Sequence, residues 1–373
     1  PDPVLTPMFT RLSTPSLTRF PGSLTRSPGA ARGASTFIAA LALLALLGTS
    51  LASCSSTRET EDDGRPKLTE KEKLGLYFEN AMRYINMGEN ARAEDQAFRA
   101  LEIEPKNERF LLIYGQSKLL QGTSADIQAA IEIFESIPTK DDYRVQMFWG
   151  AAVERAGVLY DEAASGVRDG SRPTDAPDRA QRAAELESEA RRQWREAKEH
   201  FLLSREIYPG EPQSLGGLVR TTALLGEMDE SIAFSRELID SIRSSQRLVM
   251  IQLEDDGLSA EDETRLLDNR RSNREFEVKT RLHIAFLLEE LGRYNEAVTE
   301  FDEILILQPD LPEAHSLKAQ LLFDLGEFVK ARTSIERFIE LRARTASFED
   351  PDIRKAYDFV ERCDRAIATS NQG

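Results

Sequence analysis

The chain has 373 residues, of which 40% are hydrophobic and 30% are charged, a composition that suffices for a sizeable folded core. Few glycines and abundant Ala, Leu, Glu and Arg predict an all-α protein. The formal net charge of −16 would repel a phosphate polyanion, so nucleic acid is not an expected partner.

Residues 1–53 have the three parts of a secretory signal peptide. From Met8 to Ser35 the chain carries four arginines and no acidic residue, and residues 37–47 then form an apolar core too short to span a bilayer comfortably. The following Leu51-Ala-Ser-Cys54 resembles the lipobox of bacterial lipoproteins. The resemblance implies that Cys54 becomes the new N-terminus and is acylated. Two or three acyl chains would anchor the protein stably in the membrane. The alternative is an ordinary signal peptide or a single-span anchor with a chance cysteine.

The residues around this cysteine suggest where the protein is held. Ser55 follows Cys54 where an aspartate would favour inner-membrane retention, so the resemblance implies the outer membrane, facing the periplasm. Residues 54–69 are polar and partly acidic, which predicts a flexible tether. Cys363 is the only other cysteine, so no disulfide framework is expected.

A recurring pattern of small and large apolar residues occupies most of the remaining chain. In its clearest copy, Ala297, Phe301 and Ile304 share one helix face. Gly292 supplies the turn before that helix, and Pro309 ends it. The same steps recur at Ala331, Ile335 and Phe338, at Ala93, Ala97, Ala100 and Pro105, and at Ala197, Phe201, Ser204 and Pro209.

A period of 34 residues with this signature resembles the tetratricopeptide (TPR) repeat. Tyr77, Ala81 and Tyr84 also resemble the aromatic and small face of the family's first helix. The resemblance covers most of the chain after about Leu74. It implies an all-α, right-handed TPR-like solenoid of antiparallel helix pairs, each buried against its neighbours. Because the family is a recognition scaffold with many partners, the resemblance leaves the partner open.

About six repeats are expected across residues 70–349. The first begins at a capping box formed by Thr69 and Glu72. The second, residues 107–138, is degenerate, and residues 123–126 are expected to lengthen the turn between its two helices.

Two insertions are expected within the solenoid, at about residues 160–190 and 243–275. The matching alanines of repeats two and three are 67 residues apart, where one repeat would give 34. Residues 165–177 are loop-like and lie between helix-forming stretches. The pattern predicts two elongated helices that form a protruding hairpin; the alternative is an additional degenerate repeat around residues 157–163.

The second insertion continues an apolar stripe at helical spacing through Ile242, Val249 and Leu253. Ser259 and Asp262 then predict a capping box where the helix resumes. Residues 350–373 are expected to form a final helix and tail that cap the open end of the stack.

The residue types that usually carry chemistry are scarce. His200, His283 and His315 lie on different repeats and lack metal-binding spacing, so no metal site is expected. The sequence contains no phosphate-binding loop and no nucleophile elbow. We therefore expect no catalytic residue, no cofactor and no small-molecule substrate, and we do not expect an enzyme.

The family binds its partners on the concave surface lined by first helices. Phe78 and Met82 stand where chaperone-binding members clamp a carboxylate with lysine and asparagine, so an apolar groove for an amphipathic helix or extended peptide is expected instead. Alternatively, several of these residues pack against a neighbouring helix or an inserted arm. The candidates for the groove are Phe78, Met82, Asn86, Leu112, Gln116, Leu119, Leu218, Thr222, Phe286, Glu289, Gln320 and Phe323.

These expectations combine into one functional hypothesis. The chain would be a lipid-anchored, non-catalytic envelope adaptor that binds or helps assemble other envelope proteins through its groove. In layout it resembles TPR lipoproteins that assist pilus secretin assembly or dock cell-wall hydrolases. The alternative is an accessory subunit of an envelope enzyme or of a secretion or pilus-type transport complex.

Overall fold

The computed structural model describes residues 68–172, 178–254, 257–345 and 350–370. The expected signal peptide, Cys54 and all but the last two residues of the expected tether lie outside the described residues. Within the described part, no helix combines the length and the apolar character that crossing a bilayer requires.

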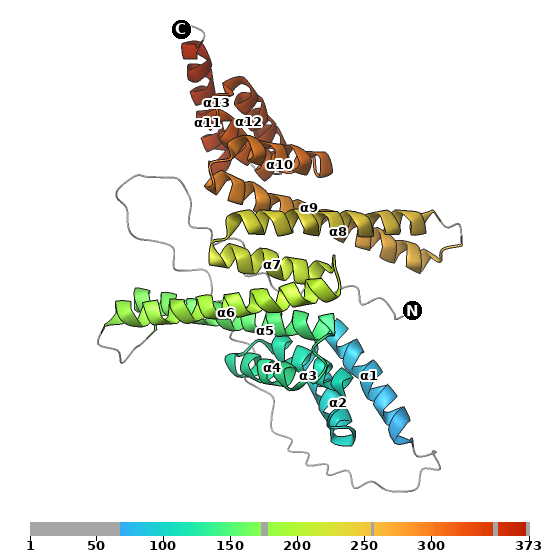
Figure 1. The fold of residues 1–373 in the computed structure, drawn as a ribbon. Coiled ribbons are helices and arrows are strands. Elements are labelled where there is room, and N and C mark those ends of the chain that lie inside the picture. The colour runs from blue at the N-terminus through green and yellow to red at the C-terminus, as the bar shows by residue number, and fades with distance from the viewer. Residues whose placement is uncertain (1–67, 173–177, 255–256, 346–349, 371–373) are drawn as a thin grey trace, which may run out of the picture.

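Thirteen helices and no strand form the described part of the chain (Figure 1). Consecutive helices pack on one another from one end of the stack to the other, as the expected all-α solenoid of helix pairs requires. In chain order they are α1 (Glu70–Met87), α2 (Asn90–Ile103), α3 (Glu108–Gln121), α4 (Ser124–Ser136), α5 (Tyr143–Asp169), α6 (Arg179–Ile207), α7 (Pro212–Leu225), α8 (Met228–Leu253), α9 (Ala260–Glu290), α10 (Tyr294–Leu307), α11 (Pro312–Asp324), α12 (Phe328–Arg342) and α13 (Pro351–Ser370).

Short polar motifs begin the helices largely as predicted. The capping box at Thr69 is present, with the Glu72 side chain accepting from the Thr69 backbone N–H. The Ser259 hydroxyl likewise accepts from the backbone N–H of Asp262 at the start of α9. The lengthened turn expected at residues 123–126 is absent. Instead, α3 ends at Gln121, Gly122 with φ +76° is its C-cap, and Thr123 directly caps α4.

Helices approach closely where one of them carries a glycine or alanine. The repeated alanines of the sequence pattern, such as Ala97 and Ala297, are completely buried. At three glycines, a Cβ atom would meet an aromatic ring of the neighbouring helix at 2.6 Å or less, so the ring occupies the space that a side chain would need. The three pairs are Gly115 with Phe134, Gly157 with Trp194, and Gly217 with Phe201.

The first insertion is a hairpin of two long helices, α5 of 27 residues and α6 of 29 residues. Helix α5 continues without interruption through residues 157–163, where an additional repeat would require a turn. The two-helix prediction is therefore correct, and the extra repeat is wrong. Buried Ala164, Val167, Ala183 and Ala190 form part of the apolar surface of this pair.

The second insertion lengthens α8 and α9 into an arm that projects beyond the neighbouring helices (Figure 1). Val249 on α8 and Leu266 on α9 are buried along it. At its base, the side chain of Glu277 is 1% exposed and pairs with Arg243 on α8 and with Arg281. Arg281 also pairs with Glu300 on α10, so charged groups tie the arm to the solenoid.

Helix α13 closes the C-terminal end of the stack. It packs on α12 through buried Ile353 and Ala356, within a cluster that includes Phe338 and Ile339. Cys363 is completely buried in the neighbouring cluster, and this burial raises the pKa of its thiol.

Candidate interaction groove

In the N-terminal half, the first helices of neighbouring repeats touch directly, because α1 packs on α3, α3 on α5, and α5 on α7. The ring of Phe78 lies edge-on to that of Phe110 with a centroid distance of 6.5 Å, and the Arg109 guanidinium covers it at 3.3 Å. Met82 is half-buried in the same cluster, whereas Asn86 is exposed. Phe78 and Met82 therefore serve mainly to join α1 to α3.

Burial removes four predicted residues from any accessible groove. The hydroxyl of Thr222 donates to the carbonyl of Leu218 at 2.6 Å, and both residues are 0% exposed. Gln116 and Leu119 are also buried, and Leu112 is half-buried beside Leu119. The prediction that these residues face a bound peptide is wrong for the buried four. Their burial agrees with the alternative, in which such residues pack against neighbouring helices, as Leu218 and Leu119 do within their apolar clusters.

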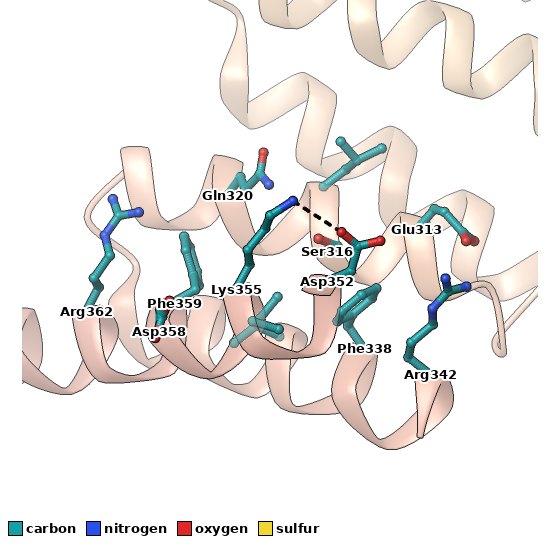
Figure 2. A pocket seen from close by; sticks show the side chains of 13 residues that line it. Glu313, Ser316, Gln320, Phe338, Arg342, Asp352, Lys355, Asp358, Phe359 and Arg362 are labelled. Atoms are coloured by element: carbon teal, nitrogen blue, oxygen red, sulfur yellow. Dashed lines mark hydrogen bonds and ion pairs between the residues drawn. The ribbon is translucent and has the colours of Figure 1, made fainter. Parts of the chain in front are cut away.

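At the C-terminal end, a groove of about 710 Å³ opens between α11 and α13 and has α12 beneath it. Figure 2 shows Glu313, Ser316 and Gln320 of α11 along one side and Asp352, Lys355 and Phe359 of α13 along the other, with Phe338 and Arg342 of α12 near one end. Of the predicted residues, Gln320 lines this groove directly. The full lining is Glu313, Ser316, Leu317, Gln320, Ile335, Phe338, Arg342, Asp352, Lys355, Ala356, Asp358, Phe359 and Arg362.

The groove combines an apolar floor with charges of both signs at its edges. Leu317, Ile335 and Phe338 supply the floor. The Lys355 ammonium lies 3.4 Å from the Asp352 carboxylate, and both side chains are more than half exposed. Such an exposed ion pair is worth little in free energy, so it can exchange for contacts with a ligand at small cost.

Phe359 and Arg362, which line the groove, also contact aromatic rings beside it. The Phe323 ring lies 5.2 Å from the ring of Phe359 and 5.1 Å from that of Phe328. The Arg362 guanidinium stacks 5.0 Å from the Phe323 centroid and 5.3 Å from the Phe359 centroid. These contacts hold a cation at a fixed position beside an apolar surface.

Two further predicted residues lie on α9. Glu289 is close to Asp324 of α11; burial first, and then this negative neighbour, raises the pKa of Glu289. Phe286, one turn earlier, is half-buried. Of this acidic pair, only Glu289 is among the predicted groove residues.

Sequence reasoning missed the contribution of α12 and α13 to the groove. Only first helices of repeats were considered, and the final helix was treated solely as a cap. A signal was present, because Lys355, Phe359 and Arg362 are spaced by four and three residues and share one helix face.

The two most buried histidines have structural surroundings. His200 Nδ1 lies 2.8 Å from Gln146 Oε1, and its ring stacks on Trp149 at 4.2 Å. His283 Nε2 lies 3.0 Å from the hydroxyl of Ser231. Burial lowers the pKa of both imidazoles to about 4, with the charge of Lys140 adding to the effect at His200. No group of three or more potential metal ligands occurs among the described residues.

Comparison with known proteins adds a family match over part of the chain. A family model described as tetratricopeptide repeat matches residues 285–346, which span the end of α9 through α12. No curated protein matches the sequence.

Several solved structures are similar to part of this structure, at low sequence identity. The MamA protein is 14% identical over 64% of this chain and 93% of its own, with a TM-score of 0.40. A thermophilic TPR protein of Thermus thermophilus is 18% identical over 68% of this chain and 100% of its own, with a TM-score of 0.37. YrrB, a TPR protein with an unusual peptide-binding site, is 11% identical over 67% of this chain and 93% of its own, with a TM-score of 0.38. The match to the tetratricopeptide-repeat family is thus confined to residues 285–346, and the other described helices continue the same stacking of consecutive helices.

Proposed function

We propose that this protein is a non-catalytic, membrane-tethered scaffold that binds a segment of another envelope protein in the groove between α11 and α13. The observation that carries the proposal is the groove itself, which has an apolar floor, accessible charges and a volume of about 710 Å³. The repeat architecture supports a role in protein binding. The lipobox-like sequence at Cys54 supports the tether.

The lining favours an amphipathic helix as the bound segment. An apolar stripe on that helix would cover Leu317 and Phe338, and its polar flanks would reach Lys355 and Asp358 at the edges. A helix that binds in a groove places apolar side chains three and four residues apart on one face and polar side chains beside them. The apolar floor and charged edges of this groove suit such a helix.

A tryptophan that fills the groove tests this binding. We expect Gln320→Trp to reduce the recovery of co-purifying envelope proteins at least tenfold, because the ring would occupy the exposed space above the floor. Thr333→Trp is the matched control, since Thr333 is exposed on α12 and does not line the groove. Equal recovery with both variants, measured by quantitative mass spectrometry, would contradict the proposed binding site.

The tether requires a separate measurement. We expect the mature chain to begin at Cys54 and its first peptide to carry the mass of two or three acyl chains. We expect Cys54→Ser to release the protein from the membrane fraction. A mature N-terminus at another residue, or an unmodified Cys54 peptide, would remove the lipid anchor from the proposal.

The second candidate is an accessory subunit of an envelope enzyme or of a secretion or pilus-type complex. The projecting α5–α6 hairpin favours it, because a long arm offers a second contact surface (Figure 1). This candidate predicts co-purification with one catalytic partner at a fixed stoichiometry. A general adaptor instead predicts several partners, each below one copy per chain.

A further inference from the structure

One side of the α8–α9 arm presents two parallel stripes of side chains. On α8, Arg243, Arg247 and Met250 follow one another at steps of four and three residues, and Glu254, the C-cap residue, follows four residues later with helical backbone angles. The four residues therefore share a helix face. On α9 the same rule groups a second stripe. Its members are Glu263, Leu267, Arg270, Arg274 and Glu277.

The two stripes lie side by side because their ends at the base of the arm are in contact. Arg243 Nε donates to Glu277 Oε1 at 2.9 Å. On the other flank, Asn273 Nδ2 reaches Ser245 Oγ at 3.4 Å, which fixes the antiparallel register of the helices. We call the surface beyond this base the arm face; it comprises Arg247, Met250 and Ile251 of α8, its C-cap Glu254, and Glu263, Leu267, Arg270 and Arg274 of α9.

In this register the arm face is divided into three bands. Glu254 and Glu263 form an acidic band at the tip. Met250, Ile251 and Leu267 form an apolar band next to it. A basic band lies closest to the solenoid and consists of Arg247, Arg270 and Arg274.

The arm face lacks internal partners within the described part of the chain. None of its arginines forms an ion pair with a described residue, and Arg247 donates only to the hydroxyl of Ser244. The exposed fractions are 64% for Ile251, 46% for Leu267 and 41% for Met250. A shallow hollow of about 530 Å³ beside Met250 and Ile251 leaves space for a side chain from outside.

We propose that a second copy of this chain covers the arm face, with the two arms packed antiparallel around a two-fold axis through the apolar band. Glu254 and Arg247 are seven residues apart, about 10 Å along a helix, with Ile251 near the midpoint. A two-fold axis there places the acidic band of each copy on the basic band of the other. The same operation places the two apolar bands against each other, which makes the surface self-complementary.

Other occupants fit the bands less well. An anionic membrane would attract the basic band, but it would repel exposed Glu254, Glu261 and Glu263 at the tip. A uniformly acidic helix would meet the acidic band and be repelled there. The surface requires a partner with both charges in the reverse order, and an antiparallel copy of the arm supplies that order.

The size of the arm face sets the expected strength of the dimer. A few apolar side chains from each copy give an interface at the small end of those that hold protein complexes together, so we expect a dissociation constant in the micromolar range. Because the ion pairs would be partly exposed, we expect the dimer to weaken as salt increases.

A charge-swap experiment on the full chain tests the interface. One variant carries R247E, R270E and R274E, and a second carries E254R and E263R. The wild-type chain is expected to sediment as a dimer at about 100 µM, and each variant alone as a monomer, because its two bands then have the same sign. An equimolar mixture of the two variants is expected to restore the dimer.

Each outcome of the sedimentation experiment decides the proposal. A monomeric wild type, or variants that remain dimeric, would overturn it. Two monomeric variants whose mixture stays monomeric would also overturn it, since the predicted register pairs their bands. Circular dichroism of each variant confirms that the helices are retained.

Cysteine crosslinking provides a second test that leaves every charge in place. With Cys54→Ser as background, Ile251→Cys is expected to form an intermolecular disulfide on oxidation, because the two-fold axis brings the two copies of this position together. Gln252→Cys is the matched control; it is exposed on the same helix but points away from Met250 and Arg247 of the arm face. Native Cys363 is completely buried. Equal crosslinking of both variants would contradict the predicted interface. The α11–α13 groove is unchanged in both tests, so this proposal and the proposed function can fail independently.

Discussion

Glu277 is a charged residue placed almost entirely inside the protein. Its carboxylate accepts from Arg243 at 2.9 Å and from Arg281 at 3.2 Å, and Arg281 in turn donates to Glu300 at 2.6 Å. A buried carboxylate is tolerable only with such partners, because it has lost its hydration. The cluster joins α8, α9 and α10 at the base of the arm.

Removing this carboxylate is expected to destabilise the fold. Glu277→Ala leaves Arg281 buried without its neighbour on the same helix, and breaking such pairs costs on the order of 3–5 kcal/mol. Glu303→Ala is the control, because the Glu303 side chain is 41% exposed, and we expect a loss of about 1 kcal/mol or less. Urea unfolding monitored by circular dichroism measures both, and equal losses would contradict the importance of burial at Glu277.

His283 makes stability depend on pH. Its pKa is about 4 in the folded protein and about 6.5 in the unfolded chain, so the unfolded chain binds more protons between these values. Neutral His283 therefore makes its full contribution to the free energy of unfolding above pH 6.5, and this contribution is lost as the pH falls toward 4. The full shift corresponds to about 3 kcal/mol. We expect His283→Gln to lose less stability between pH 7.5 and about 5 than the wild type does; identical losses in urea unfolding would refute this.

At the scale of helices, tight packing depends on glycines opposite aromatic rings. A Cβ atom on Gly217 would lie 2.4 Å from the Phe201 ring, whereas one on Gly75 of α1 would meet nothing within 4 Å. The same substitution should therefore have opposite effects at the two positions.

We expect Gly217→Ala to destabilise the protein by about 1–3 kcal/mol, because the overlap with Phe201 outweighs the gain in helix propensity. Gly75→Ala is expected to be neutral or to stabilise by up to about 1 kcal/mol through propensity alone. Thermal unfolding distinguishes them. A stabilised Gly217→Ala variant would show that α6 and α7 can separate freely.

The sequence was most informative about features that depend on neighbouring residues. The helix face containing Ala297, Phe301 and Ile304 is buried as expected, because period and residue size are local properties. The turn at Thr123 was mispredicted, because a capping threonine and a loop residue look alike without the following helix.

The sequence pattern could not predict the distances between neighbouring repeats. Leu218 and Gln320 occupy first-helix positions of similar type, yet Leu218 is completely buried and Gln320 lines an open groove. Periodicity shows which side of a helix faces inward, but the separation of neighbouring first helices follows from packing along the whole stack. For that reason the sequence suggested four C-terminal candidates but not their partners on α12 and α13.

The two proposed attachment sites, the membrane tether and the partner-binding groove, belong to opposite ends of the solenoid. The expected tether precedes α1, and the groove lies between α11 and α13 (Figure 1). A partner bound in the groove would thus be separated from the membrane by the stack of helices. The arm face, on α8 and α9, would leave both ends accessible in a dimer.

The most direct test of the proposed groove is site-specific photo-crosslinking in cells. A photoreactive residue at Lys355, whose side chain is 78% exposed at the groove, is expected to crosslink to a partner peptide with an amphipathic helical pattern. The same residue at Tyr357 is the control, because Tyr357 is 48% exposed on α13 but does not line the groove. A crosslink at Lys355 that is absent at Tyr357 is the predicted result. Adducts at Tyr357 alone, or the same adducts at both positions, would contradict binding in the groove.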